Sequence, residues 1–115
     1  CVMSPLNLTK VFNSVKKTGH LLVLDTSTPI CSLSSEIVSQ TLIKCFSNLK
    51  SNPEILALPH VPQPTSFSLT KNFYNDYEDI IKSVKKILKI KKDIKFKEST
   101  KFFHDVPDDS FKGPF

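Results

Sequence analysis

Few side chains in this sequence could do acid–base chemistry at neutral pH, and they are widely spaced. His20, His60 and His104 are the only groups whose ordinary pKa lies near neutrality. No serine and aspartate accompany them in an order typical of a catalytic triad, so we assign no catalytic residue. His60 is the candidate for a ligand or interface contact. It lies in a proline-rich segment expected to pass the carboxyl ends of parallel strands, where α/β sheets place ligands.

The cysteines and glycines exclude several other kinds of site. Cys1, Cys31 and Cys45 are odd in number and lack metal-ligand spacing, which predicts neither a disulfide framework nor a zinc site and fits a reducing cytoplasm. We expect Cys45 to be a small core residue on the apolar face of a helix. With only Gly19 and Gly113, the sequence has no glycine-rich phosphate-binding loop, so we expect no cofactor to bind this chain alone.

Lysine supplies all of the positive charge. The net charge is +5, and the sixteen basic residues are all lysines. Nine of them lie between Lys82 and Lys101, against two acids in that stretch. The first interpretation is the solvated face of a helix and its extension; the second is a surface for an acidic partner. Base-edge readout and bidentate phosphate binding favour arginine, so this composition disfavours nucleic acid as a partner.

Two helices, each leading into a strand, are expected in the first half of the chain. The first helix follows Asn7 as its cap and ends at Gly19, with an apolar stripe of Leu8, Val11, Phe12 and Val15. Residues 21–24 then predict a parallel strand buried on both faces. The second helix has Ser34 or Ser35 as its expected N-cap, and its apolar stripe consists of Val38, Leu42, Cys45, Phe46 and Leu49. A strand then begins at Glu54.

A third helix is predicted after a crossing segment. Three prolines and no helical period between Pro59 and Asn75 predict an extended crossing. Asp76 is the expected N-cap of the helix that follows. Its buried stripe consists of Ile80, Ile81, Val84, Ile87 and Leu88, with lysines largely on the other side. This alternation predicts an α/β domain with a mostly parallel sheet and helices on both faces.

The last part of the chain differs in composition from the rest. Five of the nine phenylalanines lie in the last twenty residues, which is too apolar for a freely solvated tail. We therefore divide the chain into a domain at 1–91 and a Lys/Phe-rich tail at 92–115. The tail is expected to dock on its own domain or on a partner, with Phe111 and Phe115 as candidate interface residues. No apolar run is long enough to span a bilayer, and the start at Cys1 suggests an excerpt from a longer polypeptide.

Several segments of the sequence carry a family resemblance. They are SPLNL from Ser4, VKKTGHLLVLD from Val15, SEIVSQ from Ser35, PHVPQPTS from Pro59 and LTKNFYNDYEDIIKSVKKIL from Leu69. In this order they resemble the C-terminal domain of transketolase-type enzymes, as found in the β subunit of thiamine diphosphate-dependent 2-oxoacid dehydrogenases. The similarity covers most of residues 4–91, and the ending DVPDDSFKGPF is similar to that of some β-subunit-like proteins.

The resemblance implies a three-layer α/β/α domain that lacks its first β-α-β unit. The sequence departs from the pattern of the family at TSTPICSLSSEI, where residues with side chains stand in place of the family's glycines. The resemblance further implies a non-catalytic assembly domain in contact with other subunits, and with an acyltransferase core. Thiamine diphosphate and magnesium would belong to modules elsewhere in the complete enzyme. The alternative is a stand-alone basic module for nucleic acid or an acidic partner.

Overall fold

A computed structural model describes residues 4–70 and 73–91 of the chain. Their order is α1 (Thr9–Thr18), β1 (Leu22–Leu24), α2 (Leu33–Cys45), a 3-10 turn (Phe46–Asn48), β2 (Glu54–Leu56), α3 (Phe67–Thr70) and α4 (Tyr77–Leu88). The predicted alternation of helix and strand is thus confirmed.

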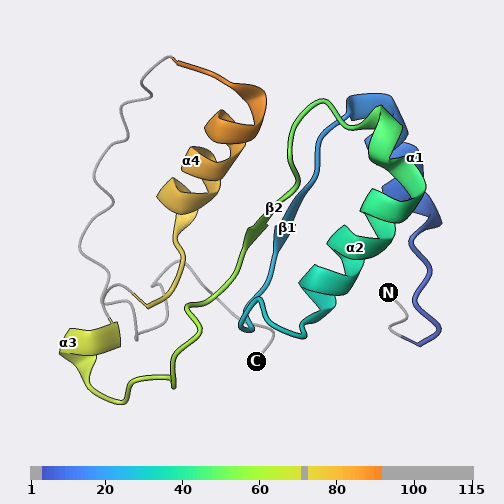
Figure 1. Ribbon diagram of the computed structural model, residues 1–115. Helices are drawn as coiled ribbons and strands as arrows, with labels where there is room; N and C mark the ends of the chain where they lie inside the picture. Colours follow the sequence, from blue (N-terminus) through green and yellow to red (C-terminus); the bar gives the residue numbers. More distant parts are fainter. Residues whose placement is uncertain (1–3, 71–72, 92–115) are drawn as a thin grey trace, which may run out of the picture.

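The two strands form a parallel pair at the centre of the fold. Val23 lies opposite Ile55, and the ladder continues on both sides through Asp25 N to Leu56 O at 3.0 Å and Glu54 N to Leu21 O at 3.1 Å. Helices α1 and α2 lie on one side of the pair and α4 on the other (Figure 1). This arrangement confirms the predicted parallel α/β architecture as a partial sheet, because the described residues supply only two strands.

Helix α1 ends where the sequence predicts. Gly19 has φ +82°, the left-handed conformation that glycine adopts without a Cβ penalty, and its N–H donates to Val15 O. A Cβ built at Gly19 would lie 2.6 Å from Lys50 Cγ, so this glycine also admits the Lys50 stem. The predicted capping role of Asn7 takes a different form. Its Oδ1 accepts from Thr9 N at 3.0 Å, while Leu8 occupies the N-cap position.

Helix α2 begins earlier than predicted. Its N-cap is Ser32, not Ser34 or Ser35, and Ser32 and Ser35 together form a capping box. Three serines within four residues could each cap a helix; here the reciprocal bonds join Ser32 and Ser35, while the N–H of Ser34 donates to Asp25. Cys45 is buried as expected, and its Sγ lies 3.9 Å from Phe12 O of α1.

Helix α4 starts as predicted, at an N-cap formed by Asp76. It ends at Lys89, which adopts a left-handed conformation with φ +54°. The crossing before it, expected to be extended throughout, contains the four-residue helix α3. The sequence gives little sign of so short a helix because it spans a single turn.

Burial is lower than the sequence predicts. The first strand is not buried on both faces: Leu22 and Val23 are half-buried and Leu24 is 54% exposed. On α2 the buried residues are Ser34, Thr41 and Cys45, whereas Phe46 of the predicted stripe is 75% exposed. Of the α4 stripe only Ile87 is buried. The physical reason is that the two strands and four helices of the described residues offer too little surface to cover these side chains.

Candidate functional site

The carboxyl end of β1 holds the densest polar network of the described residues. Asp25 follows the strand directly, and its Oδ1 accepts from the N–H and the hydroxyl of Ser27 at 2.9 and 2.8 Å. Its Oδ2 accepts from Ser34 N, in the first turn of α2, at 3.3 Å. The carboxylate therefore occupies the position where the positive end of the α2 dipole could otherwise attract an anion.

Hydrogen bonding keeps Asp25 ionised. The Ser34 side chain, followed by the backbone and the hydroxyl of Ser27, lowers the pKa of Asp25 to about 2. A carboxylate held in this state accepts hydrogen bonds and does not act as a proton donor near neutral pH. We interpret Asp25 as the group that fixes the loop between β1 and α2.

The loop after Asp25 takes a glycine-type conformation without a glycine. Cys31 is exposed and has φ +50°, which a residue with a Cβ adopts at some cost. The neighbouring Ile30 is 56% exposed. The loop therefore has a left-handed backbone at a residue with a side chain, and it exposes the side chains of Ile30 and Cys31.

Of the three candidate site residues, only His60 lies among the described residues. It is exposed, four residues after β2. The crossing around it is held at its start, where Leu58 N donates to Ser27 O at 3.0 Å and Asn75 Nδ2 donates to Ala57 O at 2.9 Å. These bonds hold the start of the segment near the carboxyl end of the strands, and the ligand or interface role of His60 stays a prediction. Phe111 and Phe115 lie outside the described residues, so their interface role stays a prediction.

His20 makes a contact that the sequence did not suggest. Its Nδ1 lies 2.8 Å from Ser51 Oγ, so the turn before β1 is joined to the turn before β2. Among the described contacts no carboxylate completes a triad with this pair. The arrangement suits a structural link between the two turns.

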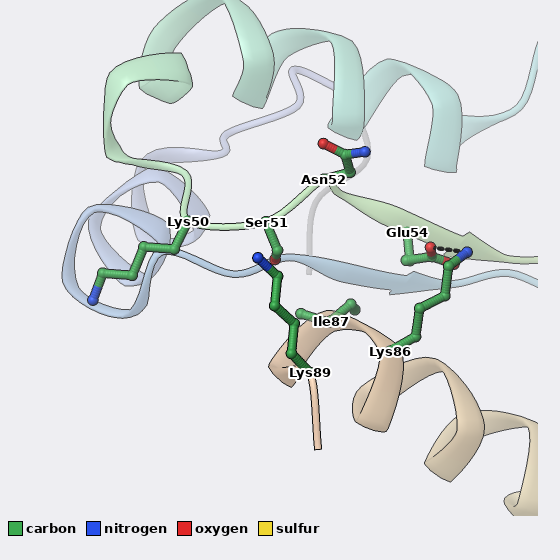
Figure 2. A pocket seen from close by; sticks show the side chains of 7 residues that line it. All are labelled: Lys50, Ser51, Asn52, Glu54, Lys86, Ile87 and Lys89. Atoms are coloured by element: carbon green, nitrogen blue, oxygen red, sulfur yellow. Dashed lines mark ion pairs between the residues drawn. The ribbon is translucent and has the colours of Figure 1, made fainter. Parts of the chain in front are cut away.

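A basic pocket of about 330 Å³ opens at the amino end of β2, between the strand and the end of α4 (Figure 2). Three lysines and one glutamate line it, together with uncharged residues. Lys86 forms an ion pair with Glu54, and Lys89 extends toward Ser51 across the pocket. The sequence placed these lysines on a solvated face; it could not show that the turn carrying Lys50 approaches them. The lining consists of Lys50, Ser51, Asn52, Glu54, Lys86, Ile87 and Lys89.

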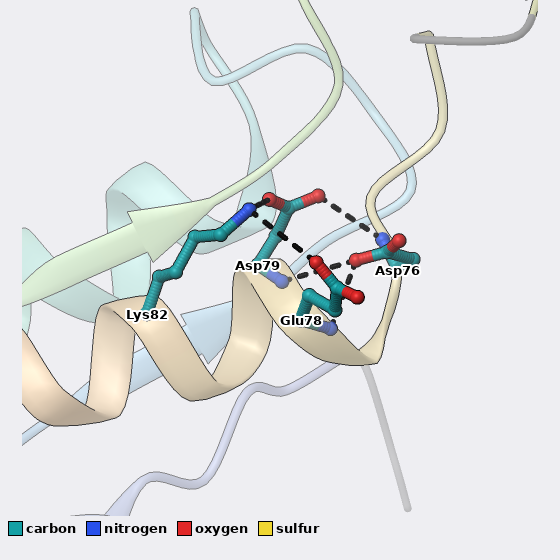
Figure 3. A network of polar contacts seen from close by, with 4 residues as sticks. All are labelled: Asp76, Glu78, Asp79 and Lys82. Carbon is teal, nitrogen blue, oxygen red and sulfur yellow. Dashed lines mark hydrogen bonds and ion pairs between the residues drawn. The ribbon is translucent and has the colours of Figure 1, made fainter. Parts of the chain in front are cut away.

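The start of α4 carries a second charged network (Figure 3). Asp76 Oδ1 accepts from the N–H groups of Glu78 and Asp79 at 2.9 and 3.1 Å. Lys82 Nζ lies 3.1 Å from Asp79 Oδ1 and 4.0 Å from Glu78 Oε2. The hydrogen bond from Lys82 lowers the pKa of Asp79, and the same contact raises the pKa of Lys82. This network stabilises the start of α4, and the two carboxylates partly balance the positive charge of Lys82.

The end of helix α2 and the 3-10 turn that follows it expose two large apolar side chains, Ile43 and Phe46, which we call the apolar patch. Ile43 is 70% exposed and Phe46 is 75% exposed. Large apolar side chains gathered on a surface mark contact sites more often than isolated ones do. Phe46 belonged to the predicted core stripe, so its apolar character was visible in the sequence while its exposure was not.

Neither a metal-binding cluster nor a membrane-spanning helix is found among the described residues. Residues 4–70 and 73–91 contain no group of three or more His, Cys, Asp or Glu side chains that could hold a metal ion. They also contain no helix that is long and apolar enough to cross a bilayer.

Comparison with known proteins agrees with this parallel α/β arrangement. The family model described as the transketolase C-terminal domain matches residues 2–80. The β subunit of the acetoin:2,6-dichlorophenolindophenol oxidoreductase of Cupriavidus necator is 32% identical over 87 residues, which are 76% of this chain and 26% of that subunit. The β subunit of the pyruvate dehydrogenase E1 component of Rickettsia bellii is 30% identical over 89 residues, 77% of this chain and 27% of that subunit.

The chain therefore belongs to the transketolase C-terminal domain family. This confirms the resemblance inferred from the ordered motifs. The chain spans about a quarter of the length of the curated relatives it matches.

Proposed function

We propose that this chain is a subunit-contact domain of a thiamine diphosphate-dependent enzyme of the 2-oxoacid dehydrogenase or transketolase type. It contributes no catalytic residue of its own. Decarboxylation and binding of thiamine diphosphate and magnesium belong to other modules of the complete enzyme. Its partners are other subunits of that enzyme, including an acyltransferase core, and its location is the cytoplasm.

The apolar patch of Ile43 and Phe46 is the observation that carries the proposal. Exposed apolar side chains on a protein of this size are stabilised by contact with another surface. Burying Phe46 alone is worth about 1.5–3 kcal/mol, which is a large contribution to a specific contact. Strand β1 is only partly covered, and its Leu24, which is 54% exposed, adds apolar surface of the same kind.

The Asp25 network supports the non-catalytic part of the proposal. In α/β proteins the first turn of a helix that follows a strand often binds the phosphate of a cofactor. Here the carboxylate of Asp25 accepts from Ser34 N in that turn. A phosphate brought to this helix end would meet an ionised carboxylate, and the repulsion opposes binding.

Titration of the isolated chain with thiamine diphosphate and magnesium tests this reading. Isothermal calorimetry is expected to give no binding heat beyond dilution. Saturable binding with a stoichiometry near one would contradict the proposal, because it would place a cofactor site within these residues.

The alternative, a basic module for nucleic acid, is tested by binding to random-sequence DNA. Two of the α4 lysines are already engaged, since Lys86 pairs with Glu54 and Lys82 with Asp79. We expect no binding even at low salt. Micromolar binding that falls steeply with added salt would support the alternative instead.

A further inference from the structure

Helix α4 carries more apolar surface than its packing within the described residues uses. The structure divides its predicted stripe of Ile80, Ile81, Val84, Ile87 and Leu88 between two faces. Ile87 is 6% exposed, and Figure 2 shows it on the side of α4 that faces the strands. Ile80 precedes Ile87 by seven residues, which places it on the same face. The other three residues of the stripe belong to a second face.

This second face, which we call the α4 seam, consists of Tyr77, Ile81, Val84 and Leu88. Their spacing of four, three and four residues places them in one row along the helix, as at the d and a positions of a coiled coil. Tyr77 is 41% exposed, Val84 37% and Leu88 46%. Ile81 is half-buried. The seam is therefore a row of partly exposed apolar side chains along the whole helix.

Charged side chains border the seam on the side away from the strands. Glu78 and Lys85 lie seven residues apart, at the e positions when Ile81 is an a position. The Glu78 side chain is 40% exposed, and its contact with Lys82 Nζ is long, at 4.0 Å. This border is thus acidic near the start of the helix and basic near its end.

The apolar part of the seam matches a second copy of itself when the two helices run in opposite directions. A two-fold axis through the middle of α4 brings Ile81 opposite Val84 of the second copy. The same axis brings Tyr77 opposite Leu88. Every seam residue then has an apolar partner, as the a and d residues of a coiled coil do.

The charges select the same arrangement. In the antiparallel pair Glu78 lies beside Lys85 of the second copy, and the two-fold axis repeats this contact. In a parallel pair the e positions would instead lie beside Ile80 and Ile87, and no opposite charges would meet. The charge pattern of α4 therefore favours a second copy of the chain in the antiparallel direction.

We propose that two copies of this chain associate through antiparallel contact of their α4 seams, with Glu78 and Lys85 paired on both sides of the two-fold axis. This inference goes beyond the proposed function and does not rest on it. The apolar patch lies across the strand pair from α4, so it stays accessible to another subunit (Figure 1). A seam on a helix of 12 residues is small beside the interfaces of permanent dimers, so the dimer should be weak.

Sedimentation velocity of the full chain at increasing concentration measures this association. The unaltered chain is expected to shift from monomer to dimer. Glu78→Lys or Lys85→Glu alone places like charges opposite each other and should weaken the association about tenfold or more. The matched control is Lys16→Glu, which reverses an exposed lysine in the last turn of α1. It should leave the association unchanged.

Mixing the two variants gives the sharpest test. A Glu78→Lys chain has lysine at both border positions and a Lys85→Glu chain has glutamate at both, so each repels itself and attracts the other. The equimolar mixture should therefore recover the association that each variant lacks. This recovery also shows that both variants are folded, which far-UV circular dichroism checks separately.

Two apolar substitutions separate this dimer from the subunit contact proposed for the apolar patch. Leu88→Ser should weaken the association about tenfold or more, because it removes apolar contact at both ends of the seam. Phe46→Ser, on the other side of the strands, should leave it unchanged. The proposal is overturned if the unaltered chain stays monomeric up to about 1 mM. It is also overturned if the mixture associates no better than the single variants, or if Phe46→Ser weakens association as much as Leu88→Ser does.

Discussion

Asp25 shows how one side chain fixes both a loop and a helix start. It follows β1 directly, bonds Ser27 in the loop and reaches Ser34 in the first turn of α2. The sequence shows an acidic residue after an apolar run with serines close behind it. Nothing in this spacing indicates that the chain returns to Asp25 nine residues later, at Ser34.

The stability contributed by Asp25 should depend on pH. Folding lowers its pKa from 3.8 to about 2, so the ionised form stabilises the fold above about pH 4, and this contribution is lost as pH falls from about 4 to about 2. At pH 7, Asp25→Ala should lower the free energy of unfolding by about 1 kcal/mol in urea titrations.

The difference between the variant and the unaltered chain should shrink in titrations at pH 4 and then pH 3. Ser39→Ala, at an exposed position of α2, provides a control with no expected pH dependence. An Asp25 effect of equal size at all three values would show that its charge is not what stabilises the loop.

Gly19 is a second position where one residue decides the local structure. Gly19→Ala forces a Cβ into a left-handed backbone, at 2.6 Å from Lys50 Cγ. We expect a loss of about 1–3 kcal/mol in the free energy of unfolding, measured by urea titration. Adding Lys50→Ala should recover the part that comes from the clash and leave the backbone part. A loss below about 0.5 kcal/mol for Gly19→Ala would contradict the observed turn.

At the scale of elements, the ends of helices were more predictable than their burial. Asp76 caps α4 and Gly19 ends α1 as the sequence indicates, because capping depends on residues next to one another in the chain. The N-cap of α2 was misplaced by two or three residues because Ser32, Ser34 and Ser35 are locally equivalent. The cap that forms is the reciprocal pair of hydrogen bonds between Ser32 and Ser35, which the spacing of the serines alone does not single out.

The capping of α4 gives a prediction for that element. Asp76→Ala removes the acceptor for the N–H groups of Glu78 and Asp79 and should destabilise the fold by about 1 kcal/mol. Asp76→Asn keeps a capping oxygen and should cost only a few tenths of that. Urea titration followed by circular dichroism measures both. Equal losses for the two variants would show that charge, and not hydrogen bonding, is the main contribution.

At the scale of the whole molecule, the parallel α/β architecture was predictable and the exposed surface was not. Alternating helices and apolar strands predict the parallel pair. The run LLVL is typical of a strand covered on both faces, yet Leu24 is 54% exposed, and the patch of Ile43 and Phe46 faces outward. Sequence patterns report which residues favour burial, but they do not say whether the chain or a partner covers them.

The exposed apolar surface is therefore where the account of this molecule can be tested as a whole. Lys44 lies between Ile43 and Phe46 and is exposed, so an amine-reactive cross-linker reports on what contacts the patch. The measurement is cross-linking mass spectrometry on the tagged chain purified from the cells that naturally produce it. Lys16 on α1, also exposed, serves as the reference position.

We expect Lys44 to be linked to another subunit of a thiamine diphosphate-dependent enzyme, and Phe46→Ser to remove that link while leaving the reactivity of Lys16 unchanged. A chain that purifies alone, with Lys44 linked only to its own residues, would contradict the assignment of this domain to subunit contact.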